Sequence, residues 1–270
     1  MRVLCSTGAL IGRPNGRNPR LLGELTKKLQ GDGVEFMMYS TWYDTVEEIT
    51  DYVNTLGLTI PVYHCQKTLG EDVTRGDFAE AYRKMSVNAK QAHDIGADRM
   101  VFHLWNGEIS DCCFENNLKA YGDLRAIAAD HGVDLLVENV VCNVEDPLLH
   151  WRQIADRYED PHFIFDTKMA AFHGQIEAFC EGEYAWAWKE GLVRHYHIND
   201  YAGGYKDWTA LKTLPIGAGK VDFEAFLSFV KSTGYDDTFT LESTAFDKTG
   251  AVDADMLNRQ VAYLREQWNR

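Results

Sequence analysis

Short apolar runs alternate with longer amphipathic segments along the whole chain, and this alternation constrains the fold more than any other feature. The apolar runs are rich in Val, Ile, Phe and Tyr, which are typical of strands because branched and aromatic side chains pack well on a pleated surface. Eight such runs lie at 3–9, 34–40, 59–65, 98–105, 133–140, 162–168, 193–200 and 238–243. No linker rich in Pro, Ser or Gly interrupts them, so we expect one domain over residues 1–270.

The segments between the runs have the periodicity of helices, for example at 19–30, 45–57, 78–96 and 114–132. Several approach the next strand through a glycine of the kind that ends a helix, namely Gly57, Gly96, Gly132 and Gly234. Strands joined by crossover helices form a parallel sheet, and eight repeats close it into a barrel of about 250 residues. An open doubly wound sheet would usually carry G-x-G-x-x-G after its first strand, which STGALIGRPNG does not match. We therefore predict an α/β fold, a single (β/α)8 TIM barrel.

The composition limits the kinds of molecule that we expect this chain to bind. No run approaches the roughly 18 apolar residues of a membrane span, and MRVLCSTGAL fits a first strand better than an export signal. Six cysteines are scattered without a C-x-x-C pair, which favours a reducing cytoplasm. A net charge of -14 repels phosphodiester backbones. We expect a cytoplasmic protein with a small-molecule partner and neither a nucleic-acid nor a membrane partner, while a homo-oligomer stays open.

Imidazole and carboxylate side chains close six consecutive predicted strands. In a barrel of this type catalytic groups lie where strands end, so these positions carry functional weight: His64, His103, Glu138, Asp166, His197 and Glu242. Any one of them alone is more often structural than functional. Three carboxylates in one barrel mouth would repel each other strongly, however, and a divalent cation is the usual remedy. The joint pattern therefore favours a metal site.

The predicted ligands are three carboxylates and one imidazole, namely Glu138, Asp166, His197 and Glu242. Mixed oxygen and nitrogen ligands suit one divalent ion, with Mn²⁺ first and with Mg²⁺, Co²⁺ or Zn²⁺ as alternatives. His195 lies two residues before His197, so strand alternation turns both to the same face. We expect His195 to support the site from the core rather than to bind the metal.

Five segments resemble the xylose isomerase-like superfamily, which includes sugar and sugar-phosphate isomerases and epimerases, inosose dehydratases and endonuclease IV. They are LLVENV with Glu138, FIFDT with Asp166, HYHINDY with His197, LPIGAGKVDF, and TLES with Glu242. The resemblance spans nearly the whole chain. It implies that these four residues bind one metal and that Glu138 and Glu242 also transfer protons, as the matching glutamates do in the epimerases.

The chain departs from two branches of that superfamily. His64 and His103 match two further metal-binding histidines of endonuclease IV, so a second metal sharing Glu138 stays open. The third metal site of that nuclease needs a histidine where this chain has Met169, which argues against cleavage at abasic sites. Ketose 3-epimerases place a substrate-binding histidine at the same position. Lys168 and His173 are the substitutes that the sequence offers, although Lys168 fits a solvated loop equally well.

The resemblance implies a metal-dependent isomerase or epimerase that acts on a small sugar or sugar phosphate through an enediolate, with Glu138 and Glu242 as the acid/base pair. A metal-dependent dehydratase of the inosose or dehydroshikimate type is the alternative, and a phosphodiesterase like endonuclease IV or a non-catalytic sugar binder is less favoured. The predicted substrate-binding residues are His64, His103, Trp105 and Lys168. Aromatic residues in loops often wall a sugar site, but they also pack locally.

The segment GAGKVDF has two interpretations. Glycines before a helix can bind phosphate through free backbone N–H groups. The alternative is a tight turn before a helix capped by Asp222, which we favour.

Overall fold

The computed structural model describes all residues, 1–270. Its strands form a closed barrel in the order β1-β2-β3-β4-β5-β6-β7-β8, and the pairs with a defined register are parallel. The bounds are β1 Arg2–Ser6, β2 Gly33–Met37, β3 Val62–His64, β4 Arg99–Phe102, β5 Asp134–Glu138, β6 His162–Asp166, β7 Val193–Ile198 and β8 Thr238–Leu241. The predicted α/β fold, a (β/α)8 barrel, is confirmed.

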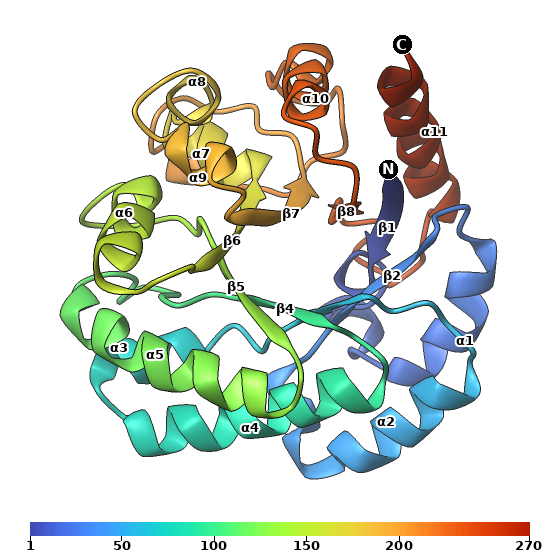
Figure 1. Ribbon diagram of the computed structural model, residues 1–270. Helices are drawn as coiled ribbons and strands as arrows, with labels where there is room; N and C mark the ends of the chain where they lie inside the picture. Colours follow the sequence, from blue (N-terminus) through green and yellow to red (C-terminus); the bar gives the residue numbers. More distant parts are fainter. The chain divides into compact units, whose positions relative to one another are not determined.

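Helices follow the strands in sequence (Figure 1). Their bounds are α1 Leu22–Leu25, α2 Val46–Thr55, α3 Leu69–Arg75, α4 Phe78–Asp94, α5 Phe114–Asp130, α6 Pro147–Arg157, α7 Thr167–Phe172, α8 Ile176–Cys180, α9 Trp186–Lys189, α10 Phe223–Ser232 and α11 Ala254–Asn269. After α4 and α5 the chain turns at Gly96 and Gly132, whose φ angles of 86° and 73° lie in the left-handed region that favours glycine. None of these helices is long and apolar enough to cross a membrane.

The first predicted helix, over 19–30, is only partly formed. The structure has 3-10 turns at Pro19–Leu21 and Thr26–Lys28 on either side of the short α1. The Thr26 hydroxyl donates to the Leu22 carbonyl at 2.6 Å, and such bonds from a threonine to its own backbone compete with regular helix formation. Gly23 in the middle of the segment weakens the helix further.

The chain forms two compact units. Unit 1 comprises Met1–Phe36, Asp166–Gly191 and His195–Arg270, and unit 2 comprises Met37–Phe165 and Leu192–Arg194. In unit 1 the N-terminal strand β1, dark blue in Figure 1, packs against the C-terminal helix α11 in dark red. In unit 2 helices α3, α4 and α5 pack against one another. That the two units make one domain over residues 1–270 stays a prediction.

The strands are buried along nearly their whole length. In β5 and β6 every residue after the first is buried, on both faces of the strand, as expected where a parallel sheet is enclosed by helices. The burial continues through the polar residues at the strand ends, because Glu138 is 1 % exposed and Asp166 is fully buried. These side chains need partners in the interior, since a buried charge without one is costly.

Candidate metal centre

Three of the four predicted metal ligands lie together in unit 1. Asp166 ends β6, His197 lies in β7 and Glu242 follows β8. The Nδ1 atom of His197 is 4.0 Å from Asp166 Oδ2 and 3.6 Å from Glu242 Oε2. Two carboxylates and an imidazole nitrogen therefore converge on one buried point.

Asn199 links the two carboxylates of this group. Its Nδ2 donates to Asp166 Oδ2 at 2.9 Å and to Glu242 Oε2 at 3.2 Å. Both bonds place a partial positive charge between two acidic groups and so reduce their repulsion. Asn199 was not among the predicted residues, although its position two residues after His197 in the strand alternation was a signal that it faces the same way.

A third carboxylate, Glu35 in β2, lies on the other side of His197. Glu35 Oε2 is 2.9 Å from Nε2 of His197 and 3.2 Å from Nε2 of His195, and all three side chains are fully buried. His195 is also held by the hydroxyls of Thr238, 2.8 Å from Nδ1, and of Thr240, 2.9 Å from Nε2. Glu35 was not among the predicted residues. Its only signal was an acidic side chain inside the apolar run at 34–40.

The two histidines beside Glu35 determine the direction of its pKa shift. Burial alone would raise the pKa of Glu35, but the imidazoles of His197 and His195, whose Nε2 atoms lie at hydrogen-bond distance, hold the pKa well below its usual range. Glu35, His195 and His197 also offer three ligand atoms within 4.8 Å of one another.

Glu138, the fourth predicted ligand, lies with His64 and His103 in unit 2. Glu138 Oε2 is 2.6 Å from His103 Nε2 and 3.7 Å from His64 Nε2. The Nδ1 atom of His64 lies 2.9 Å from the Cys65 carbonyl, which can only accept, so Nδ1 carries a proton. The structure thus brings the two predicted substrate-binding histidines onto the Glu138 carboxylate, and the three residues are a second group with metal-ligating atoms in reach of one another.

Another buried polar group of unit 2, centred on Asp111, holds the loop after β5 by hydrogen bonds. Asp111 accepts the backbone N–H groups of Asn143, Val144 and Glu145 at 2.9, 3.0 and 2.9 Å, and its Oδ2 lies 2.9 Å from Nε2 of His150. Burial would raise the pKa of Asp111, but the hydrogen bonds from His150 and the backbone lower it below its usual range. Because both carboxylate oxygens are engaged, we interpret this group as structural, although Cys142 brings a third ligand atom near it.

Two further predicted substrate-binding residues are buried. Trp105 is fully buried, donates from Nε1 to the Val140 carbonyl at 3.0 Å and packs edge-on against Phe114. Lys168 is 7 % exposed, and its ammonium lies 3.3 Å from the Thr213 hydroxyl. The substrate-binding roles of His64, His103, Trp105 and Lys168 stay predictions.

The segment GAGKVDF forms the predicted turn. The buried Asp200 carboxylate accepts the backbone N–H groups of Gly217, Gly219 and Val221 at 2.9, 2.8 and 3.1 Å. A Cβ atom at Gly219 would collide with that carboxylate, so the turn requires glycine there. Asp222 caps α10 by accepting the Ala225 N–H at 2.9 Å, which confirms the favoured interpretation. The N–H groups that could have bound phosphate are thus used within the chain.

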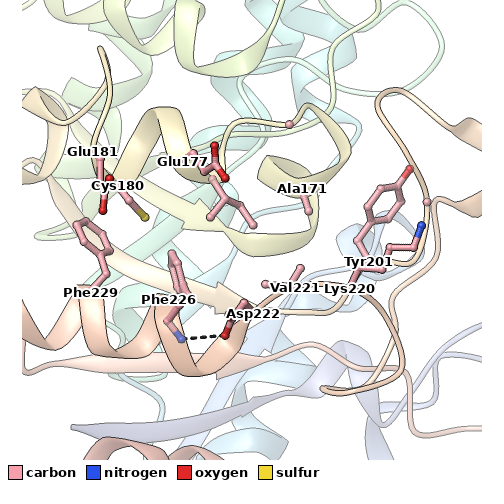
Figure 2. A pocket seen from close by; sticks show the side chains of 14 residues that line it. Ala171, Glu177, Cys180, Glu181, Tyr201, Lys220, Val221, Asp222, Phe226 and Phe229 are labelled. Carbon is pink, nitrogen blue, oxygen red and sulfur yellow. Dashed lines mark hydrogen bonds between the residues drawn. The ribbon is translucent and has the colours of Figure 1, made fainter.

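A cavity of about 740 Å³ lies elsewhere in unit 1, between α8 and α10 (Figure 2). Phe226 and Phe229 of α10 form an apolar wall, and Glu177 of α8 and Lys220 lie on its lining. None of the predicted site residues lines this cavity, so it is separate from the carboxylate cluster.

The comparisons with known proteins agree with this architecture. The family described as xylose isomerase-like TIM barrel matches residues 24–267. Among solved structures, the IOLI protein with a bound zinc atom is 16% identical with a TM-score of 0.70 and coverage of 100% of this chain and 98% of that one. D-allulose 3-epimerase from Methylomonas sp. in complex with D-allulose is 16% identical, with a TM-score of 0.70 and coverage of 99% and 97%. The 3-keto-D-glucoside 4-epimerase YcjR from E. coli is 15% identical, with a TM-score of 0.66 and coverage of 98% and 99%. No curated protein matches the chain significantly.

Proposed function

Since the chain belongs to the xylose isomerase-like TIM barrel family, we propose that it is a divalent-metal-dependent enzyme that isomerises or epimerises a small sugar or sugar phosphate. The observation that carries the proposal is the buried group of Asp166, His197 and Glu242, in which an imidazole nitrogen lies within 4.0 Å of both carboxylates. Two of the structural relatives are sugar epimerases by their names, and one holds zinc, which agrees with this chemistry.

The donor set fits a divalent cation. Two buried carboxylates with an imidazole carry net negative charge in a region of low dielectric, where a cation is strongly stabilised. We propose Glu138 as the fourth ligand. Glu138 ends β5, and its register partner on the neighbouring strand β6 is Ile164, two residues before Asp166. The ion is Mn²⁺ in our proposal, with Mg²⁺, Co²⁺ and Zn²⁺ as alternatives for the same ligands.

When bound, the ion supplies a Lewis acid that polarises a substrate carbonyl and so acidifies the adjacent C–H. Glu242 and Glu138 do the proton transfer: one carboxylate removes the proton beside the carbonyl to give an enediolate, and the other returns a proton to it. Asn199 keeps Glu242 directed at the site through its hydrogen bond at 3.2 Å. At 8 % exposure the Glu242 side chain is the most accessible member of the unit 1 group, as a carboxylate that contacts substrate must be.

His64, His103, Trp105 and Lys168 are the proposed substrate contacts. Lys168 is the group that would bind a substrate phosphate or carboxylate, because the backbone N–H groups of the GAGK turn already bind Asp200. The proposed partner is therefore a small sugar or polyol, without nucleic acid or membrane. A cytoplasmic location and a homo-oligomeric state stay predictions.

A dehydratase is the second candidate, since it begins with the same proton abstraction and then expels a hydroxyl. The mass of the product distinguishes the two, because isomerisation leaves it unchanged and dehydration removes a water. The His64, His103 and Glu138 group is the observation that favours a second metal of the endonuclease IV type. Elemental analysis tests it: about one ion per chain supports our proposal, and two or more supports the multi-metal alternative.

Solvent deuterium tests the acid-base assignment. The wild type is screened with ketoses, aldoses, inososes and their phosphates in the presence of Mn²⁺. With its substrate it should incorporate solvent deuterium at the carbon beside the carbonyl. Glu242→Gln should lose that exchange and about 10²- to 10⁴-fold in turnover while still binding substrate. Glu177→Gln, in the separate cavity of unit 1, is the matched control and should exchange normally. Turnover without label would point to hydride transfer and would remove the acid-base roles of Glu138 and Glu242.

A further inference from the structure

Glu35 lies at the Nε2 atom of His197, whereas Asp166 and Glu242 lie near Nδ1 of the same ring. A carboxylate oxygen of Glu35 is also within 4.8 Å of one of Glu242. Glu35 is fully buried, and its Oε2 lies 2.9 Å from Nε2 of His197. The same oxygen lies 3.2 Å from Nε2 of His195. An oxygen with two ring nitrogens at hydrogen-bond distance accepts from both, so the geometry places the proton between Glu35 and His197 on Nε2 of the imidazole. In the neutral ring the lone pair then lies on Nδ1, the atom 3.6 Å from Glu242 and 4.0 Å from Asp166.

We propose that Glu35 is a positioning residue that fixes the Nε2–H tautomer of His197, so that Nδ1 is the atom offered to a cation beside Asp166 and Glu242. The inference rests on the proposed metal site. In the opposite tautomer Nδ1 would carry a proton directed at the ligand group and could not coordinate. Carboxylates behind metal-ligating histidines act in this way by fixing both the tautomer and the plane of the ring.

His195 in turn holds the Glu35 carboxylate. Its Nε2 lies 3.2 Å from the same oxygen, and its Nδ1 lies 2.8 Å from the Thr238 hydroxyl. A threonine hydroxyl can donate to Nδ1, which leaves Nε2 of His195 protonated and directed toward Glu35 and Thr240. The chain of contacts therefore runs from Thr238 through His195 to Glu35, whose carboxylate accepts from both His195 and His197.

The tautomer of His197 is the first readout, and it needs no metal. Nitrogen NMR of protein labelled in its histidine side chains distinguishes protonated from unprotonated ring nitrogens, and the His197→Gln variant identifies the signals of His197 by their loss. In the metal-free wild type we expect Nε2 to be protonated and Nδ1 to be unprotonated. Glu35→Ala should remove this preference, and Glu35→Gln, which retains an accepting oxygen of similar shape, should keep part of it.

Mn²⁺ affinity, measured by competition with a chelator, is the second readout. We expect Glu35→Ala to weaken binding by about 10- to 100-fold, the usual effect of removing a partner behind a ligating histidine, and Glu35→Gln to weaken it less. Thr26→Val is the matched control, because it removes the hydrogen bond of a buried hydroxyl in unit 1 that is not part of this chain of contacts. Its affinity for Mn²⁺ should stay close to that of the wild type.

The outcomes separate this inference from the proposed function. If Asp166→Asn abolishes Mn²⁺ binding while both Glu35 variants keep the tautomer and the affinity of the wild type, the metal site stands and the role of Glu35 is wrong. An equal loss of affinity in Thr26→Val would also overturn it, because the effect would then be a general loosening of the interior. If the wild type binds no Mn²⁺ at all, the proposed function fails, and the tautomer in metal-free protein still decides the role of Glu35. Should Glu35→Ala not fold, Glu35→Gln supplies both readouts.

Discussion

Asn199 offers a direct test of the charge balance in the proposed metal centre. Its amide nitrogen lies 2.9 Å from Asp166 Oδ2 and 3.2 Å from Glu242 Oε2. Asn199→Asp keeps the shape of the side chain but replaces this donor by an oxygen, which brings a third carboxylate within hydrogen-bond distance of two others. We expect the metal-free variant to be markedly less stable than the wild type at neutral pH.

The size of the loss follows from two limits. Two unit charges about 3 Å apart repel by about 5 kcal/mol at an effective dielectric constant near 20, and the new carboxylate would have two such neighbours. Protonating it instead costs about 1.4 kcal/mol for each pH unit above its unfolded pKa of about 3.9, which is about 4 kcal/mol at pH 7. Protonating the new carboxylate costs less than this repulsion, so the loss of unfolding free energy should not exceed about 4 kcal/mol.

The pH dependence has a definite sign. The carboxyl group at position 199 would have a raised pKa in the folded state, so the native protein would bind more protons than the unfolded chain, and its stability would fall as the pH rises. The difference from the wild type should be near zero below about pH 4 and should grow to about 1.5 kcal/mol at pH 5. Above the folded-state pKa of the new group the difference becomes constant.

Urea unfolding of chelator-treated protein at pH 5 and pH 7, repeated with saturating Mn²⁺, measures these differences. Mn²⁺ should restore much of the lost stability, because a cation replaces repulsion by attraction. Asn258→Asp is the control, since Asn258 is a buried amide that donates to the Lys28 carbonyl. The unfolding free energy that Asn258→Asp loses should not be restored by Mn²⁺. An equal loss for Asn199→Asp at both pH values, or one that Mn²⁺ leaves unchanged, would refute the charge argument.

Three further predictions concern single residues. His197→Ala should lose Mn²⁺ in a chelator competition yet still unfold cooperatively. His195→Ala should lose unfolding free energy while it keeps most of its Mn²⁺ affinity. Loss of Mn²⁺ in His195→Ala with retention in His197→Ala would contradict both roles. Lys168→Met should raise KM for a phosphorylated or carboxylated substrate in steady-state assays and leave kcat nearly unchanged, so a selective fall in kcat would count against a binding role. Asp111→Asn should lower the unfolding free energy in urea by about 2 to 3 kcal/mol at pH 7, because charge-assisted hydrogen bonds are lost. Since the folded-state pKa of Asp111 is lowered, its contribution is fully present above the unfolded pKa of about 3.9 and is lost as the pH falls through the folded pKa. The difference between Asp111→Asn and the wild type should therefore shrink only below about pH 4, and a difference that is constant down to pH 2 would contradict this assignment.

The barrel and the candidate ligands could be predicted because both depend on local patterns. Strand periodicity is visible over six to eight residues, and the end of each strand is where a barrel presents functional groups. That rule alone was enough to name Asp166, His197 and Glu242, which the structure brings together in unit 1. The partial first helix was not predicted, because a hydroxyl bond between Thr26 and Leu22 is one of several local alternatives that hydrophobic periodicity does not distinguish.

The supporting residues could not be predicted, because their partners are distant in sequence. Asp111 binds backbone groups of a loop more than thirty residues later, with sequence separations of 32, 33 and 34. Glu35 and His197 are separated by 162 residues. A lone acid in an apolar strand indicates that a partner exists, since a buried charge must be compensated, but the sequence does not say which residue it is.

The partners of the buried carboxylates bear on the proposed binding of a cation. Glu35 is held by His195 and His197, Glu138 lies against His103, and Asn199 bridges Asp166 and Glu242. Imidazole and amide groups satisfy the hydrogen-bonding needs of a carboxylate without a fixed positive charge, whereas a lysine or arginine in the same place would neutralise it. The negative charge of Asp166 and Glu242 therefore remains available. Because two negative charges in a dry interior repel strongly, a divalent ion at the proposed site would stabilise the folded protein more than an ion bound by acids that face water.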